Sequence, residues 1–289
     1  MTIAVTGAGG QLGSELCRRL GERATGLAYP DFDLTNRNSI ERTLYSLQPE
    51  AIINCAAYTQ VDKAETERDL CRVVNGTSVG ILAEVCEELD IPLVQISTDY
   101  VFGSDAERNS PYSESDKPNP QGTYGLTKLE GETLASNWKK HFIVRTCGLY
   151  SWVDEGPVRG RNFVDTMISL GRERDKLNVV ADQICAPTFV PHLCEAIENL
   201  LKTKEYGTYH VTNSGEVSWF AFAKLIFELS GLAVQVTPIT TAQYNAPAPR
   251  PAYSVLDNSR LREVTGSGLP TWQQGLVEYL QNVREKASC

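Results

Sequence analysis

Long apolar runs, basic clusters and internal repeats are all absent from this sequence of 289 residues. No apolar run reaches the roughly 18 residues of a membrane-spanning helix, so we expect no segment that crosses a membrane. The 27 Lys and Arg residues are scattered, and the formal net charge of -9 disfavours binding to nucleic acid or to an anionic membrane surface. With 42% hydrophobic residues, the chain is ordinary for a globular protein that buries a core.

The eight cysteines lack the Cys-x-x-Cys spacing that is typical of zinc and redox motifs. Most lie inside apolar segments, where a thiol behaves as a small hydrophobic side chain. We therefore expect reduced cysteines and no zinc site. Met1 leads into a predicted strand without a basic region, an apolar region and a cleavage site, so the expected location is the cytoplasm.

The N-terminus has the pattern of a strand, a glycine-rich turn and a helix. Residues 2–6 are apolar and β-branched, and residues 7–13 read Gly-Ala-Gly-Gly-Gln-Leu-Gly. In this context Gly7 can make the tight turn, Gly10 lets the backbone approach a pyrophosphate, and Gly13 lets the helix pack closely on the sheet. The sequence predicts a dinucleotide-binding turn, and a structural glycine turn is the alternative.

The end of the second predicted strand does not decide between NAD and NADP. An acid there would bind the ribose hydroxyl of NAD, and a base would bind the phosphate of NADP. Asp31 and Asp33 instead fall in the loop after the strand at 25–29. Asp33 is either an adenine contact or the N-cap of the helix expected at 37–47.

Two further strands are continuously apolar, as in a parallel sheet that is buried on both faces. Residues 51–57 end in small side chains, and residues 92–98 end in hydroxyl groups. Because ligands bind at the carboxyl ends of such strands, Thr98 is placed to contact a substrate carbonyl, although a loop cap is the alternative. Strands and helices alternate, which predicts an α/β fold with a Rossmann-like doubly wound parallel sheet.

The pattern loosens after the strand that ends near residue 146. Residues 1–150 are expected to form the dinucleotide-binding domain, with segments near 185–213 returning to it. Residues 151–289 are expected to form mainly a smaller C-terminal α/β substrate-binding domain. Between them, residues 152–161 hold two glycines and a proline and predict a loop.

Tyr124 and Lys128 lie four residues apart in a predicted helix, so their side chains project from one face. An adjacent ammonium stabilises a phenolate, which lowers the pKa of the phenol and makes Tyr124 a candidate general acid. Tyr124 is the only tyrosine with a lysine four residues later. Alone, the spacing is weak, because a solvated helix face can show it as well.

Together, the glycine turn, Ser97-Thr98 and the Tyr124/Lys128 pair resemble an extended, nucleotide-sugar-binding short-chain dehydrogenase/reductase. Residues 54–65, 97–102, 182–188 and 250–254 resemble the dTDP-4-dehydrorhamnose reductase family more specifically. This resemblance covers nearly the whole chain. It implies NAD(P)H-dependent reduction of the 4-keto group of a dTDP-linked 6-deoxyhexose, from dTDP-4-dehydro-L-rhamnose to dTDP-L-rhamnose, with NADPH or NADH as the cofactor.

The resemblance also assigns roles to residues. Tyr124 is the expected proton donor, Lys128 holds the nicotinamide ribose, and Thr98 binds the substrate carbonyl. The expected cofactor contacts are Gly7, Gly10, Gln11, Leu12, Gly13, Asp33, Leu34, Ala56, Ala57 and Tyr58, with Tyr124 and Lys128. The expected substrate contacts are Thr98, Asp99, Asp182, Gln183 and Arg250, although Asp182 and Gln183 also fit a structural turn.

Two positions depart from the family pattern. The family's reductases commonly continue Arg-Thr-Ser-Trp after the tyrosine helix, with the tryptophan against the sugar, whereas this chain ends the run with Gly148. We expect the glycine to leave that space open for a bulkier or different sugar, unless Tyr150 or Trp152 fills it. Some members hold a divalent ion at a dimer interface; Glu15 matches one of the glutamates but Pro191 replaces another. A homodimer is therefore compatible with the sequence, and no required metal is expected.

Two other functions share these motifs. Nucleotide-sugar dehydratases and epimerases have the same turn and Tyr/Lys pair, but dehydratases follow the threonine with an Asp-Glu pair, and here Tyr100 follows Asp99. A non-catalytic NADP-binding regulatory subunit, similar to the accessory subunit of methionine adenosyltransferase, is the other alternative. The complete set of Thr98, Tyr124 and Lys128 favours catalysis.

Overall fold

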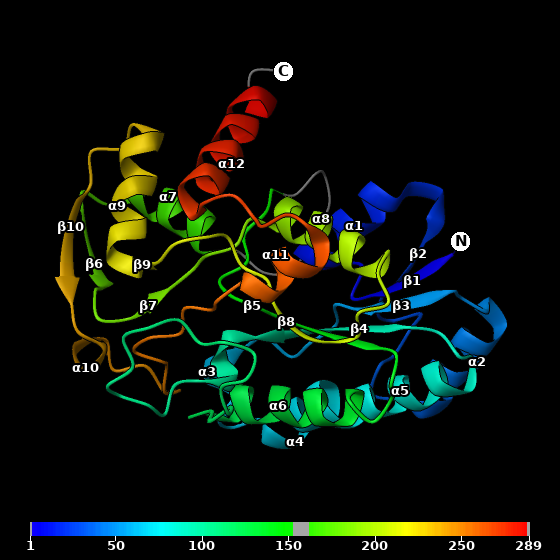
Figure 1. Ribbon diagram of the computed structural model, residues 1–289. Helices are drawn as coiled ribbons and strands as arrows, with labels where there is room; N and C mark the ends of the chain where they lie inside the picture. Colours follow the sequence, from blue (N-terminus) through cyan, green and yellow to red (C-terminus); the bar gives the residue numbers. More distant parts are fainter. Residues whose placement is uncertain (1, 153–161, 288–289) are drawn as a thin grey trace.

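A parallel sheet of six strands forms the centre of the structure, a computed structural model that describes residues 2–152 and 162–287 (Figure 1). The sheet has the order β2-β1-β3-β4-β5-β8, which confirms the doubly wound α/β prediction. Because the order reverses between β1 and β3, the expected ligand crevice lies at their carboxyl ends. The strands are β1 (Ile3–Thr6), β2 (Ala24–Leu27), β3 (Ala51–Asn54), β4 (Leu93–Thr98), β5 (His141–Thr146) and β8 (Gly207–His210).

Helices cover both faces of the sheet (Figure 1). Successive side chains of a strand point to opposite faces, so Val94 and Ile96 of β4 enter one hydrophobic core while Leu93 enters the other. The first core is closed by α1 (Gln11–Leu20), α8 (Val190–Leu201) and α11 (Ser259–Thr265), and the second by α2 (Arg37–Leu47), α5 (Ser78–Glu88) and α6 (Thr123–Ala135).

A π-helical turn separates two of the helices that follow β3. The chain runs through α4 (Arg68–Arg72), the π turn at Val73–Thr77 and then α5. The turn holds Asn75 in the interior, where its amide accepts from Tyr58 N (2.8 Å) and donates to Tyr58 O (3.1 Å). Such turns are frequent at functional sites, and this one fixes the backbone that follows β3.

The later part of the chain forms a smaller unit with its own aromatic core beside the sheet. It contains the parallel pair β6 (Lys176–Val180) and β10 (Gln235–Ile239), the antiparallel pair β7 (Ile184–Cys185) and β9 (Val217–Ser218), and the helices α7 (Phe163–Glu173), α9 (Trp219–Ser230) and α12 (Trp272–Ala287). The short helices α3 (Val61–Ala64) and α10 (Thr241–Tyr244) lie outside these cores. Apart from Trp152, the loop predicted at 152–161 lies outside the described residues, among which no helix is long and apolar enough to cross a membrane.

Candidate active site

The glycine turn packs backbone to backbone against the segment that follows β3. A Cβ on Gly7, whose φ is +65°, would lie 2.7 Å from Ala56 N, and a Cβ on Gly13 would lie 2.3 Å from Gly7 O. Only glycine fits at these two positions. Gly10 precedes α1 without a side-chain cap, which leaves the first amides of the helix for another acceptor. This cradle fits a dinucleotide pyrophosphate.

Two orphan hydroxyl groups lie at the carboxyl edge of the sheet near this turn. Thr146 Oγ1, at the end of β5, and Ser151 Oγ are buried without a hydrogen-bond partner in the described part of the chain. Gln11 Oε1 accepts from Ser151 N (2.9 Å) and so ties the glycine turn to this segment. Buried hydroxyl groups are normally paired, so the two orphans fit a polar ligand such as a nicotinamide nucleotide.

The structure brings Thr98, Tyr124 and Lys128 together at the carboxyl end of β4. The Tyr124 phenol is hydrogen-bonded to Thr98, and Lys128 Nζ donates to the carbonyl of Ile96 (2.5 Å). Burial raises the pKa of Tyr124, and the Thr98 hydrogen bond only partly offsets this. The lowered phenol pKa expected from the helix spacing is therefore wrong for this structure. Burial also lowers the pKa of Lys128 to about 8, against the effect of the nearby Glu132 carboxylate.

Asp99 anchors the end of β4 from the interior. Its carboxylate accepts from Ser254 Oγ (2.6 Å) and from Thr98 Oγ1 (3.1 Å). Burial raises the pKa of Asp99, and hydrogen bonds from Ser254, Cys147 and Thr98 oppose that rise. Asp99 thus links the catalytic strand end to β5 and to the chain near Ser254.

Glu65 is a site residue that the sequence interpretation missed. The helix α6 starts after Gly122, which has no side chain to cap it, and Glu65 supplies the acceptors instead. Its two oxygens accept from Thr123 N (2.7 Å) and from Thr123 Oγ1 (2.9 Å). This fixes the helix turn that carries Tyr124. A cap that comes from 58 residues earlier leaves no local signal in the sequence.

A buried ion pair stabilises the site through a contact with the end of β4. Arg145 Nη2 and Glu132 Oε2 lie 2.7 Å apart with both side chains 5% exposed, and Ser97 Oγ donates to Glu132 Oε1 (2.5 Å). Burial and the Arg145 charge lower the pKa of His210 to about 3, so the imidazole is neutral. It accepts from Arg145 at Nε2 (3.3 Å) and donates from Nδ1 to Tyr112 O (2.9 Å).

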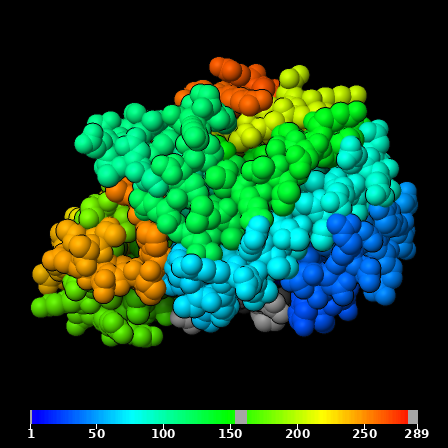
Figure 2. Space-filling model, turned by 90° about the horizontal axis from the view of Figure 1, so that it is seen from below, coloured from blue at the N-terminus to red at the C-terminus, as the bar shows by residue number. Residues whose placement is uncertain are grey.

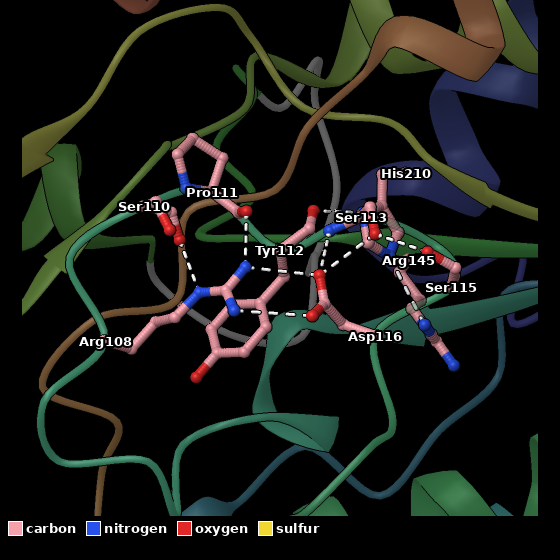
Figure 3. Close-up of polar contacts among 9 residues, drawn as sticks. All are labelled: Arg108, Ser110, Pro111, Tyr112, Ser113, Ser115, Asp116, Arg145 and His210. Atoms are coloured by element: carbon pink, nitrogen blue, oxygen red, sulfur yellow. Dashed lines mark hydrogen bonds and ion pairs between the residues drawn. The ribbon is translucent and has the colours of Figure 1, made fainter.

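Through Tyr112, the same network holds the loop that leads into α6 (Figure 3). Arg108 lies over the Tyr112 ring, 4.2 Å from its centroid, and pairs with Asp116 (3.2 Å). Asp116 also accepts from Ser113 N (2.7 Å). The loop is thus a compact unit joined to β5 and β8.

The expected cofactor contacts near β2 and β3 occupy different environments. Asp33 Oδ1 accepts from Thr35 N (2.9 Å), whereas Asn36 caps α2, so the N-cap interpretation of Asp33 is wrong. The side chains of Leu12 and Leu34 are buried in the two cores, which leaves their backbone for a ligand. Ala57 and the adjoining Tyr58 follow β3, and the Tyr58 hydroxyl donates to Glu67 Oε2 (2.7 Å).

The expected substrate contacts are divided between two places. Asp182 accepts from Thr241 N (2.8 Å), and Gln183 Nε2 donates to Thr241 Oγ1 (3.0 Å), so both side chains fix the start of α10. This geometry favours the structural-turn alternative. Arg250 instead lies near Tyr100 and pairs with Asp62 (3.0 Å).

The space in front of Gly148 is filled, so the expectation of an open pocket there is wrong. A Cβ on Gly148, whose φ is +52°, would lie 3.0 Å from Trp219 Cη2 and 3.3 Å from Pro187 Cα. Neither predicted substitute contributes, because Tyr150 and Trp152 both pack against Phe189 in the aromatic core. The nearby aromatic comes from the first residue of α9.

Glu15 and Pro191 do not assemble a metal site in the described residues. Glu15 is 5% exposed and its Oε1 lies 2.6 Å from Arg18 Nη2. Pro191 stands in the first turn of α8. No group of three His, Cys, Asp or Glu that could hold a metal ion occurs in residues 2–152 and 162–287.

Known proteins resemble this chain over almost its full length. The family model described as RmlD substrate binding domain matches residues 1–285. A dTDP-4-dehydrorhamnose reductase of Sinorhizobium fredii is 38% identical over 288 residues, with 95% of each chain covered. The spore coat polysaccharide biosynthesis protein SpsK of Bacillus subtilis is 38% identical over 283 residues, with 96% of each covered. A crystal structure of dTDP-4-dehydrorhamnose reductase from Bacillus anthracis in complex with NADP is 40% identical, with a TM-score of 0.92, and covers 98% of this chain and 100% of its own.

The parallel sheet, the glycine cradle and the Thr98/Tyr124/Lys128 cluster define an NAD(P)H-dependent oxidoreductase of the short-chain dehydrogenase/reductase class. Within this class, the chain belongs to the dTDP-4-dehydrorhamnose reductase family. The family assignment from the sequence motifs is therefore confirmed.

Proposed function

We propose that this chain reduces the 4-keto group of dTDP-4-dehydro-L-rhamnose to give dTDP-L-rhamnose, with NADPH as the preferred cofactor. The observation that supports this most is the meeting of Thr98, Tyr124 and Lys128 at the carboxyl end of β4, next to the glycine cradle. NADPH, when bound, supplies the hydride. Residues 1–150, together with segments near 185–213, bind the dinucleotide, and residues 151–289 mainly bind the sugar nucleotide.

Three side chains of this site carry the protein's part of the reduction. The Thr98 hydroxyl turns its single proton from Asp99 Oδ1 to the carbonyl oxygen and stabilises the negative charge that develops there. Tyr124 donates its phenolic proton to that oxygen; its raised pKa keeps it protonated at neutral pH, as a proton donor must be. The Lys128 ammonium binds the cofactor ribose and stabilises the phenolate that remains.

The buried position of Asp99 favours reduction over dehydration. A dehydratase needs a carboxylate that reaches the substrate, but Asp99 is 2% exposed and its Oδ2 accepts from Ser254 Oγ. The next residue is Tyr100, whose ring lies edge-on to Tyr124 at 5.7 Å. We also propose a cytoplasmic location, which the seven free cysteines of the described residues support, and a homodimer.

A direct assay of NADPH oxidation tests the proposal. Purified protein is mixed with NADPH and dTDP-4-dehydro-L-rhamnose, NADPH oxidation is followed by fluorescence, and the product is identified by mass spectrometry. We expect NADPH oxidation only when the keto-sugar is present, and slower oxidation of NADH. Calorimetry that detects no binding of either cofactor would falsify the dinucleotide assignment.

A further inference from the structure

One ion pair joins the two parts of the chain beside the catalytic tyrosine. Asp62 lies in α3, and Arg250 lies in the proline-rich segment after α10. Arg250 Nη2 donates to Asp62 Oδ2 (3.0 Å), and Ala248 N donates to Asp62 Oδ1 (3.1 Å). In Figure 2 the orange segment that contains Arg250 lies directly beside the light-blue segment that contains Asp62.

The ion pair borders a hollow that the catalytic phenol also lines. Its lining residues include Val61, Tyr100, Tyr124, Ala248 and Pro249. Val61 is the chain neighbour of one partner of the pair, and Pro249 is the neighbour of the other. Arg250 also lies near Tyr100, whose ring packs edge-on to Tyr124, so a ligand that contacts the phenol from this side comes near the guanidinium.

The two partners of the ion pair differ in solvent exposure. The Asp62 side chain is 42% exposed, so water can solvate its carboxylate if the pair separates. The Arg250 side chain is only 17% exposed, so its guanidinium needs another anion in place of Asp62. Separation of the ion pair therefore costs little free energy on the Asp62 side. On the Arg250 side it costs more, unless an anionic ligand replaces the carboxylate.

We infer that Asp62 competes with a diphosphate group of the substrate for the Arg250 guanidinium. This inference rests on the proposed function only for the presence of a diphosphate. A diphosphate carries more charge than a carboxylate and accepts bidentate bonds from a guanidinium, so it is the stronger partner. Water solvates the Asp62 carboxylate when the pair separates, so the loss of this partner opposes the exchange only weakly.

Replacement of one oxygen by nitrogen tests this exchange. Asp62→Asn removes the charge that competes for Arg250 but keeps an Oδ1 acceptor for Ala248 N. The affinity of wild type and variant is measured by calorimetry for dTDP, UDP, GDP and ADP, with thymidine as a ligand that lacks phosphate. We expect Asp62→Asn to bind the preferred nucleoside diphosphate about threefold to tenfold more tightly, with thymidine unchanged. In turnover with the keto-sugar, KM should fall while kcat stays close to wild type.

Two further variants complete the experiment. Asp90→Asn is the matched control, because Asp90 forms an exposed pair with Lys140 at 2.8 Å and has no contact with the hollow. Arg250→Gln should lose the diphosphate affinity. Equal or weaker binding of every nucleoside diphosphate by Asp62→Asn overturns the inference. Tighter binding without any keto-sugar reduction leaves the exchange intact and refutes the proposed reaction instead.

Discussion

Tyr124 meets its substrate as a neutral phenol, since burial raises its pKa. Replacement by phenylalanine removes the proton donor but keeps the ring that packs edge-on to Tyr100. We expect Tyr124→Phe to retain NADPH affinity and to slow turnover by roughly 10² to 10⁴, the usual contribution of a positioned acid. Single-turnover NADPH oxidation measures the rate, and calorimetry measures the affinity. Equal single-turnover rates in the two proteins would exclude the phenol as the donor.

Deprotonation of Lys128 should change folding stability and turnover in opposite directions as the pH increases. Burial lowers its pKa from 10.5 to about 8, so in that interval the unfolded chain holds more protons than the folded one. The free energy of unfolding contributed by this group therefore rises with pH across the interval. Turnover should instead fall as pH increases above about 8, because the ammonium that supports the phenolate is lost.

At pH 8 and above, denaturation measures the effect of Lys128 on stability, and kinetics measure its effect on turnover. Lys128→Met has no ammonium, so its stability should lack the rise that wild type shows, and its residual activity should lack the fall. If wild type and Lys128→Met lose stability in parallel as the pH increases, the assignment of this titration to Lys128 is wrong.

At the scale of elements, α6 is held at its start by Glu65 and in its last turn by Glu132. Glu132→Gln leaves Arg145 buried without its carboxylate, so we expect a loss of about 3–5 kcal/mol in the free energy of unfolding. Glu130→Gln is a control in the same helix; its pair with Arg72 is 31% and 67% exposed and should matter by less than about 1 kcal/mol. Urea denaturation measures both. Similar losses for the two variants would contradict the special role of the buried pair.

The sequence predicted those elements whose signals are local. The glycine turn and the apolar strands β3 and β4 each carry their pattern within about ten residues, and the structure has them near the predicted positions. The π turn at Val73–Thr77 was not predicted, because it depends on the contact of Asn75 with Tyr58 across the fold. The helices α3, α10 and α11 were also missed, because short helices offer less than two turns of periodicity.

For the whole molecule, the candidate site depends on contacts between distant segments. The positions of Thr98 and Tyr124 were predictable because they follow from a strand end and a helix face. The partners of Asp99 and Arg250 were not predictable from spacing, since Ser254 and Asp62 lie far away in the sequence. The proposed substrate side of the site thus depends on how the later part of the chain folds back on the first.

The contact between Gly148 and Trp219 shows a limit of comparing relatives column by column. The family pattern leads one to expect a bulky side chain shortly after β5, where this chain has Gly148. In space, the Trp219 indole at the start of α9 abuts that glycine, and the glycine leaves room for it. Two positions in separate parts of the chain therefore constrain each other. A change of side-chain size at either position affects the packing of both. Substrate preference in such relatives is better compared by the shape of the cavity wall than by the residue at one aligned position.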